Sequence, residues 1–177
     1  MSREELEKWL SIYGKDIYSF CRKLTKDKTE ADDLYQDTFL KMVELYDRLD
    51  IRQNPKSYLL SVAVNLWRNR KRKFSWRQRI TGPCISLEEL VMDIPSGKKS
   101  VEEQMISKEE KKLVRAAVDA LPEKYKLPVL LFYMVELKLS EISQILNIPE
   151  GTVKSRLYKA KQVLKRELEV VLNGKRT

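Results

Sequence analysis

The chain has 177 residues and a formal net charge of +9, enough length for one ordinary domain or two small ones. It has no histidine, which excludes imidazole catalysis and most zinc or iron sites. Its two cysteines, Cys21 and Cys84, lack a metal-ligand spacing and indicate a reducing cytosol. The longest apolar run, residues 129–135, is far shorter than the ~20 residues that span a membrane. We therefore expect a cytoplasmic protein without membrane insertion, metal or cofactor.

Helical periodicity dominates the first part of the chain and predicts three helices, over residues 2–24, 29–45 and 55–79. The second would begin at a capping-box-like pair, Thr29 and Asp32. Cys21 lies on an apolar helix face and is expected in the core. The three helices can share one core, so we predict a first domain over residues 1–79.

The second predicted helix has an acidic face with an apolar residue at its centre. Ala31, Leu34 and Met42 occupy the opposite, apolar face. A negatively charged stripe suits a basic protein surface better than DNA, although a solvated acidic face explains the same pattern. The acidic face carries Asp33, Gln36, Asp37 and Leu40.

The third predicted helix ends in a segment, residues 68–79, that contains several cations and no acid. Such a segment suits phosphate groups, whose contacts make affinity fall steeply with salt. Trp67 and Phe74 share a face with Leu60, so we expect both aromatic rings in the core. Trp76 lies on another face, where it could stack on an unpaired base; a solvated face with a stray Trp is the alternative. That face carries Asn65, Arg68, Arg72 and Trp76.

Periodicity is lost after residue 79, where glycines and prolines gather, and we predict a flexible linker over residues 80–107. Cys84 falls in this linker and is given no role. Helix returns near Ser100, and a second helical domain is expected over residues 108–177. Pro128 would either begin a helix or kink one.

Residues 139–161 have the layout of a helix-turn-helix, whose second helix enters the DNA major groove. Ser140 is the predicted N-cap of the first helix. Asn147 suits the left-handed end of that helix, and Pro149 suits the first position of the next. The second helix has a polar stripe that includes Lys154, Ser155 and Tyr158 and suits phosphates and base edges. An ordinary amphipathic helix with a basic face is the alternative.

These motifs together resemble a bacterial RNA polymerase sigma factor of the extracytoplasmic-function (ECF) group over almost the whole chain. The most specific part is Ile-Pro-Glu-Gly-Thr-Val-Lys-Ser-Arg-Leu at residues 148–157, which resembles sigma region four. The remaining matching segments are residues 33–41 and 58–65, which resemble region two, and residues 121–123, which resemble region four. The resemblance implies an all-α protein of two small helical domains joined by a flexible linker, the C-terminal one a helix-turn-helix. It implies no enzymatic activity.

The resemblance also implies partners and residue roles. Asp33, Gln36 and Asp37, with Leu40 among them, would bind the clamp helices of the beta-prime subunit of core RNA polymerase. In promoter DNA, Asn65 and the loop 47–54 would hold a flipped base of the minus-ten element, with phosphate contacts nearby. The resemblance further implies an anti-sigma factor as a partner. The residues implied for minus-ten phosphates are Arg68 and Arg72, and those for the minus-thirty-five element are Lys154, Ser155, Arg156, Tyr158 and Lys159.

Two other functions compete with this one. A free-standing, dimeric helix-turn-helix regulator explains residues 140–165 equally well, but leaves the acidic stripe and the basic helix unexplained. A carboxylate-dependent nuclease could use Glu30, Asp33 and Asp37, which share a helix face. No second acidic element visibly converges on them.

Overall fold

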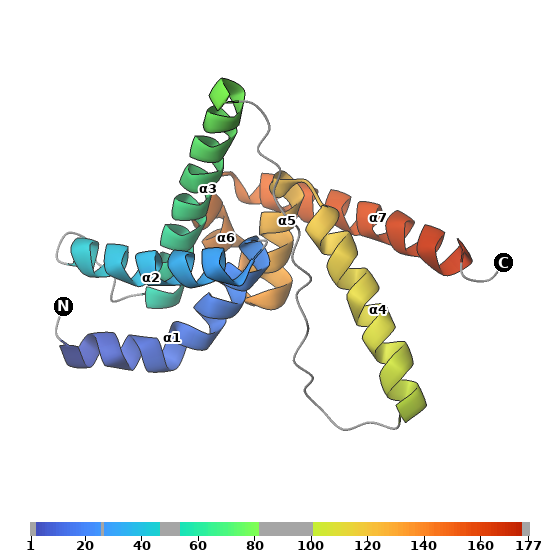
Figure 1. Cartoon of the computed structure of the whole chain (residues 1–177), viewed down its shortest axis with the longest axis horizontal. Helices are drawn as coiled ribbons and strands as arrows, with labels where there is room; N and C mark the ends of the chain where they lie inside the picture. Colours follow the sequence, from blue (N-terminus) through green and yellow to red (C-terminus); the bar gives the residue numbers. More distant parts are fainter. Residues whose placement is uncertain (1–2, 26, 47–53, 82–100, 175–177) are drawn as a thin grey trace. The chain divides into compact units, whose positions relative to one another are not determined.

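The computed structural model describes residues 3–25, 27–46, 54–81 and 101–174 (Figure 1). Every regular element in these ranges is a helix, which confirms the predicted all-α class with two helical regions. Residues 82–100, including Cys84, lie outside the described residues. The helices of the first region are α1 (Arg3–Leu24), α2 (Lys28–Leu45) and α3 (Pro55–Thr81). Those of the second are α4 (Val101–Ala120), α5 (Glu123–Val129), the π-helix η3 (Leu130–Met134), α6 (Leu139–Leu146) and α7 (Glu150–Gly174).

The first region is built from three mutually packed helices, as predicted. Each contributes apolar side chains that are completely buried, among them Phe20 of α1, Leu34 of α2 and Leu60 of α3. Cys21 is also buried, and loss of water around it raises the pKa of its thiol to about 12. Thr38 is buried among them and donates a hydrogen bond to the Leu34 carbonyl at 2.6 Å, which satisfies its hydroxyl.

The start of α2 differs from the prediction. Asp27, not Thr29, is the N-cap, and its carboxylate accepts a hydrogen bond from the Glu30 N–H at 2.8 Å. Asp32 instead accepts a hydrogen bond at 2.7 Å from the Tyr18 hydroxyl of α1, which raises the pKa of that phenol. The capping-box interpretation was therefore wrong, although the helix begins within two residues of the predicted position.

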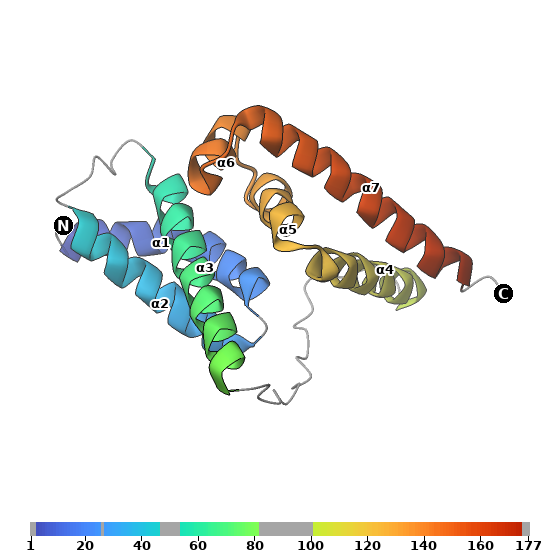
Figure 2. The ribbon, with the colours of Figure 1, turned by 90° about the horizontal axis from the view of Figure 1, so that it is seen from above.

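In the second region, the helix that begins at Val101 occupies the C-terminal part of the predicted linker. The core of the second region includes the buried residues Leu121, Val129 and Ala160, through which α5 packs against α7. Figure 2 shows α7 running alongside α4 and α5, and both pairs are in contact. Pro128 lies inside α5, and the π-helix η3 begins two residues later, at Leu130. Because proline has no N–H to donate, the hydrogen-bonding ladder is interrupted there, which fits the predicted irregularity.

The helix-turn-helix has the predicted layout with two shifted caps. Lys138, not Ser140, is the residue before α6: its carbonyl accepts from Ile142 and its N–H donates to the Glu141 carboxylate at 2.8 Å. Asn147 has the predicted left-handed backbone, with φ of 52°. Pro149 precedes α7 by one residue, and its carbonyl accepts from the first turn.

Candidate nucleic-acid and protein interfaces

The outer face of α7 carries the predicted duplex-reading residues. The helix is anchored by Val153 and Ala160, which are completely buried. On the opposite side, Tyr158 is 65% exposed. Its phenol and the neighbouring cations project from one helix, as a major-groove reader requires. Of the five predicted residues, four are exposed and Arg156 is half-buried, the exposed ones being Lys154, Ser155, Tyr158 and Lys159.

Ser155 is partly engaged by its own helix. Its hydroxyl donates a hydrogen bond to the Thr152 carbonyl at 3.0 Å. A hydroxyl oxygen that donates its one hydrogen can still accept, so in this rotamer Ser155 could accept a hydrogen bond from a base edge but not donate one. Donation to DNA would require a different rotamer.

The predicted single-strand surface extends along α3 from Asn65 to Trp76. Asn65 and Arg72 are exposed, Arg68 is half-buried and Trp76 is 64% exposed. Arg72 donates a hydrogen bond to the Asn69 side chain at 3.3 Å, which orients the guanidinium along the helix. The structure therefore brings these residues onto one accessible helix. Most of the loop 47–54 lies outside the described residues.

The prediction that Phe74 belongs to the core is wrong, because this ring is 55% exposed. Trp67 is half-buried, and the Lys71 ammonium lies 5.0 Å from the centre of its ring. Arg70 explains the difference, since its guanidinium lies 3.5 Å from the carbonyl of Glu30 in the first turn of α2. The following turns of α3 therefore pass the beginning of α2 and lose their packing partner. Figure 1 shows the end of α3 standing clear of α1 and α2.

Arg70 also joins the two predicted interfaces of the first region, which the sequence pattern did not reveal. Its guanidinium forms an ion pair with the Asp37 carboxylate at 2.5 Å. Both side chains are partly exposed, at 37% and 50%, so the pair is worth about 1 kcal/mol or less. One carboxylate of the acidic stripe is thus matched by a cation of the same chain.

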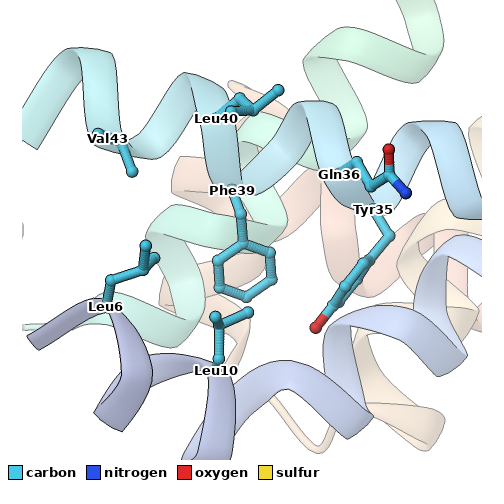
Figure 3. Close-up of a pocket in the computed structure, with 7 residues that line it drawn as sticks. All are labelled: Leu6, Leu10, Tyr35, Gln36, Phe39, Leu40 and Val43. Atoms are coloured by element: carbon cyan, nitrogen blue, oxygen red, sulfur yellow. The ribbon is translucent and has the colours of Figure 1, made fainter. Parts of the chain in front are cut away.

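The acidic face of α2 is accessible and borders an apolar groove. Asp33, Gln36, Asp37 and Leu40 are all exposed, with Leu40 at 62%. Beside them a pocket of about 310 Å³ opens between α1 and α2. Figure 3 shows Leu40 and Gln36 at its rim, with rings and aliphatic side chains of both helices around it. The pocket is lined by Leu6, Leu10, Tyr35, Gln36, Phe39, Leu40 and Val43.

Tyr35 forms one wall of this groove and is tightly fitted. Its ring contacts those of Tyr18 and Phe39, with centroids 5.5 Å and 5.0 Å away. Its hydroxyl approaches α1 at Gly14, where an added Cβ would lie only 2.9 Å from the oxygen. Burial raises the pKa of the phenol. The groove depends on how α1 and α2 meet, which the periodicity of either helix alone does not reveal.

Both helical regions match known families. Residues 10–77 match the family described as Sigma-70 region 2, and residues 111–164 match Sigma-70, region 4. The chain is 31% identical over 161 residues to the ECF RNA polymerase sigma factor SigW of Bacillus subtilis, covering 90% of this chain and 86% of SigW. It is also 31% identical to SigM of the same organism over 158 residues, covering 87% and 89%.

Solved structures share the fold. The sigma factor RpoE from Bartonella quintana, in complex with the anti-sigma factor NepR, has a TM-score of 0.77 at 20% identity, covering 94% of this chain and 98% of RpoE. CnrH, in complex with the cytosolic domain of CnrY, has a TM-score of 0.67 at 16% identity, covering 96% and 90%.

The chain belongs to the ECF group of RNA polymerase sigma factors, with sigma-70 regions 2 and 4. It directs promoter-specific initiation of transcription by RNA polymerase and is not an enzyme. This replaces the free-standing regulator and the nuclease as explanations. Within the described ranges, no helix is both long and apolar enough to cross a membrane.

Proposed function

We propose that the exposed face of α2 is where this sigma factor docks on the clamp helices of the polymerase beta-prime subunit. Asp33 and Asp37 supply negative charge, while Gln36 and Leu40 supply an amide and an apolar contact beside the groove. The exposure of Leu40 is the observation that carries this assignment. An apolar side chain surrounded by acids on an otherwise well-packed helix is typical of a protein interface rather than a DNA surface.

The basic half of α3 is proposed to hold the minus-ten element after the strands separate. Trp76 would stack on an unpaired base, and Asn65 would bond to a flipped one. Arg68 and Arg72 would contact phosphates. Stacking at ~1–3 kcal/mol per base helps to offset the few kcal/mol that unpairing costs. The exposure of Trp76 on a helix without acids supports this role.

The outer face of α7 is proposed to read the minus-thirty-five element as duplex in the major groove. Lys154, Ser155, Tyr158 and Lys159 would face the bases, and Arg156 would hold the backbone. Base-edge contacts of this kind are worth ~1–3 kcal/mol each. Exposure of four of these five side chains on the second helix of a helix-turn-helix supports the assignment.

We further propose that the chain acts in the cytoplasm and is held inactive by an anti-sigma protein. RpoE of Bartonella quintana was solved in complex with the anti-sigma factor NepR, and CnrH in complex with the cytosolic domain of CnrY. Their fold is shared by this chain, which supports a partner of the same kind.

The docking proposal is tested by run-off transcription with purified core polymerase, on promoters selected from a randomised DNA library. Asp33→Arg should abolish start-site selection without changing the circular dichroism of the free chain. Glu4→Arg, at an exposed position of α1, is the matched charge control and should remain active. Asp37→Arg is a less clean variant, because Asp37 also holds Arg70. Full activity of Asp33→Arg would contradict the docking assignment.

The duplex-reading proposal needs a separate assay. Lys154→Ala and Tyr158→Ala should weaken holoenzyme binding to the selected promoter by about 5- to 100-fold each, following the magnitude of a base-edge contact. Glu167→Ala, on an exposed later turn of α7, serves as control. If the two variants bind selected and unrelated promoters as the parent chain does, α7 does not read sequence here.

A further inference from the structure

The ion pair between Arg70 of α3 and Asp37 of α2 brings a cation of the basic helix onto the proposed docking face. Their charged atoms are 2.5 Å apart, and the same guanidinium lies 3.5 Å from the Glu30 carbonyl. Glu30, Asp33 and Asp37 follow one another at helical spacing on one side of α2. Arg70 therefore lies against the side of α2 that carries both proposed docking carboxylates.

Arg70 is directed differently from the two arginines that are proposed to contact phosphates. Each residue turns an α-helix by about 100°, so Arg68 and Arg72 each lie about 200° from Arg70 around α3. The guanidinium of Arg70 is turned toward α2, where it contacts Asp37 and Glu30. The position of Arg70 thus fits a role at the docking face rather than at DNA.

The free chain uses Arg70 to balance two neighbouring negative charges. Asp33 and Asp37 are four residues apart on one helix, where like charges repel each other. Arg70 offsets this repulsion by pairing with Asp37. A basic partner that docks on Asp37 would supply the same charge at the same carboxylate. Because two cations at one carboxylate also repel each other, Arg70 and the partner compete for Asp37.

The ion pair is open to such an exchange. The side chains of Arg70 and Asp37 are 37% and 50% exposed, so a partner can reach both of them. Figure 2 shows α2 and α3 side by side, and their packing includes the completely buried Leu34 and Leu60. Since an exposed ion pair adds little stability to such a core, displacing Arg70 leaves the fold intact.

We propose that Arg70 is an internal competitor of the polymerase clamp helices. It occupies Asp37 in the free chain and is displaced when the clamp helices dock. The affinity for core polymerase is therefore lower than the same acidic face would give without Arg70. This inference rests on the proposed docking role of α2. Removing Arg70 should strengthen docking, whereas removing a docking residue should weaken it.

The test measures binding of the fluorescently labelled full chain to purified core polymerase in the absence of DNA. Arg70→Ala should bind about 2- to 5-fold more tightly than the parent chain, the range expected for an exposed ion pair. Arg70→Met keeps most of the aliphatic stem and should show the same gain, which separates the charge from packing. Lys73→Ala removes an exposed cation one turn further along α3 and, as the matched charge control, should bind as the parent does.

A second background tests whether Arg70 acts through Asp37. In an Asp37→Ala chain the carboxylate is absent, so adding Arg70→Ala should no longer raise the affinity. In the parent background, the gain from Arg70→Ala should shrink as the salt concentration rises, because salt screens a partly exposed ion pair. A purely structural effect of Arg70 would not depend on salt in this way.

The outcomes distinguish this inference from the docking proposal. If Asp33→Arg abolishes binding while Arg70→Ala binds no more tightly than the parent, the docking face stands and only the competition is overturned. An equal gain from Arg70→Ala in the Asp37→Ala background, or from Lys73→Ala, would also overturn it, because the effect would then reflect net charge. If Asp33→Arg and Asp37→Ala both bind as the parent does, the docking face itself is wrong and the competition falls with it.

Discussion

Replacing Gly14 by alanine tests how tightly α1 and α2 fit beside the docking face. A glycine inside a helix is usually worse than alanine by about 0.5–1 kcal/mol, so the substitution alone should stabilise α1. At this position, however, the new Cβ would lie 2.9 Å from the Tyr35 hydroxyl oxygen. Tyr35 has little room to move, because its ring packs against Tyr18 and Phe39.

The two effects have opposite signs and unequal sizes. Forcing an extra carbon into a packed site costs about 1–3 kcal/mol, which exceeds the helix-propensity gain. We therefore expect Gly14→Ala to lower the free energy of unfolding by about 1–2 kcal/mol. In a Tyr35→Phe background the nearest remaining ring atom is 4.0 Å away, an ordinary contact. There the same substitution should raise the free energy of unfolding by about 0.5–1 kcal/mol.

Tryptophan fluorescence can measure the effects of Gly14→Ala and Tyr35→Phe, alone and combined, on the first helical region. Its three tryptophans, Trp9, Trp67 and Trp76, all lie in α1 and α3, so their fluorescence during urea denaturation reports the first helical region. The coupling between the two substitutions should be about 2 kcal/mol. Gly151→Ala, where an added Cβ meets nothing within 4 Å, is the control and should leave the tryptophan transition unchanged. Equal effects of Gly14→Ala in both backgrounds would refute the steric argument.

Substitutions at Asp27, Asn147 and Cys21 test the α2 cap, the turn before α7 and the buried thiol. Asp27→Ala should lower the stability of the first region by about 1 kcal/mol in the same fluorescence assay, because the N-cap of α2 is lost, whereas Thr29→Ala should change it little. Asn147→Val should destabilise the second region by about 1–2 kcal/mol in thermal melts followed by circular dichroism, since φ is 52° there, and Asn147→Gly should not. The pKa of Cys21 is raised to about 12 from 9.0, so the unfolded thiol loses its proton first as pH rises. The free energy of unfolding should therefore fall by about 1.4 kcal/mol per pH unit above pH 9, and Cys21→Ala should remove this component. In a Cys84→Ser chain, thiol labelling at pH 8 should proceed only as fast as the first region opens.

The helix-turn-helix was predictable because its turn depends on intrinsic backbone preferences. Asn147 tolerates the left-handed conformation that ends α6, and Pro149 suits the start of α7, whatever else surrounds them. The apolar periodicity of α7 likewise fixes which face is exposed, and four of the five predicted residues lie there. Local chemistry was sufficient at these positions.

The helix caps were less predictable, because several polar residues near a helix start can each serve as a cap. Asp27 caps α2 and Lys138 precedes α6, where the sequence favoured Thr29 and Ser140. Which residue acts depends on where the backbone turns, and the preceding helix and loop determine that point. Each observed cap lies two residues from the predicted one, yet this shift changes which substitution would remove the capping hydrogen bond.

Phe74 shows a different limit of periodicity. The apolar pattern correctly placed its ring on the same helix face as Leu60, which is buried. A pattern states which side chains share a face, but not how far the neighbouring helix extends along it. Arg70 already contacts the first turn of α2, and the end of α3 beyond it stands clear of α1 and α2 (Figure 1). The groove beside Leu40 was missed for a similar reason, since its walls come from two different helices, α1 and α2.

The ion pair between Arg70 and Asp37 changes how the charges of the first region should be counted. The sequence assigns every acid of α2 to one partner and every cation of α3 to another. Arg70 instead pairs with Asp37, so of the two carboxylates proposed for docking Asp33 lies outside this ion pair, and Asp37 would have to exchange or share its cation with a basic partner. On α3, the same pairing engages Arg70, whereas Arg68 and Arg72 are the residues proposed to contact phosphates. A contact of about 1 kcal/mol thus adds little stability, yet it decides which charges each interface presents.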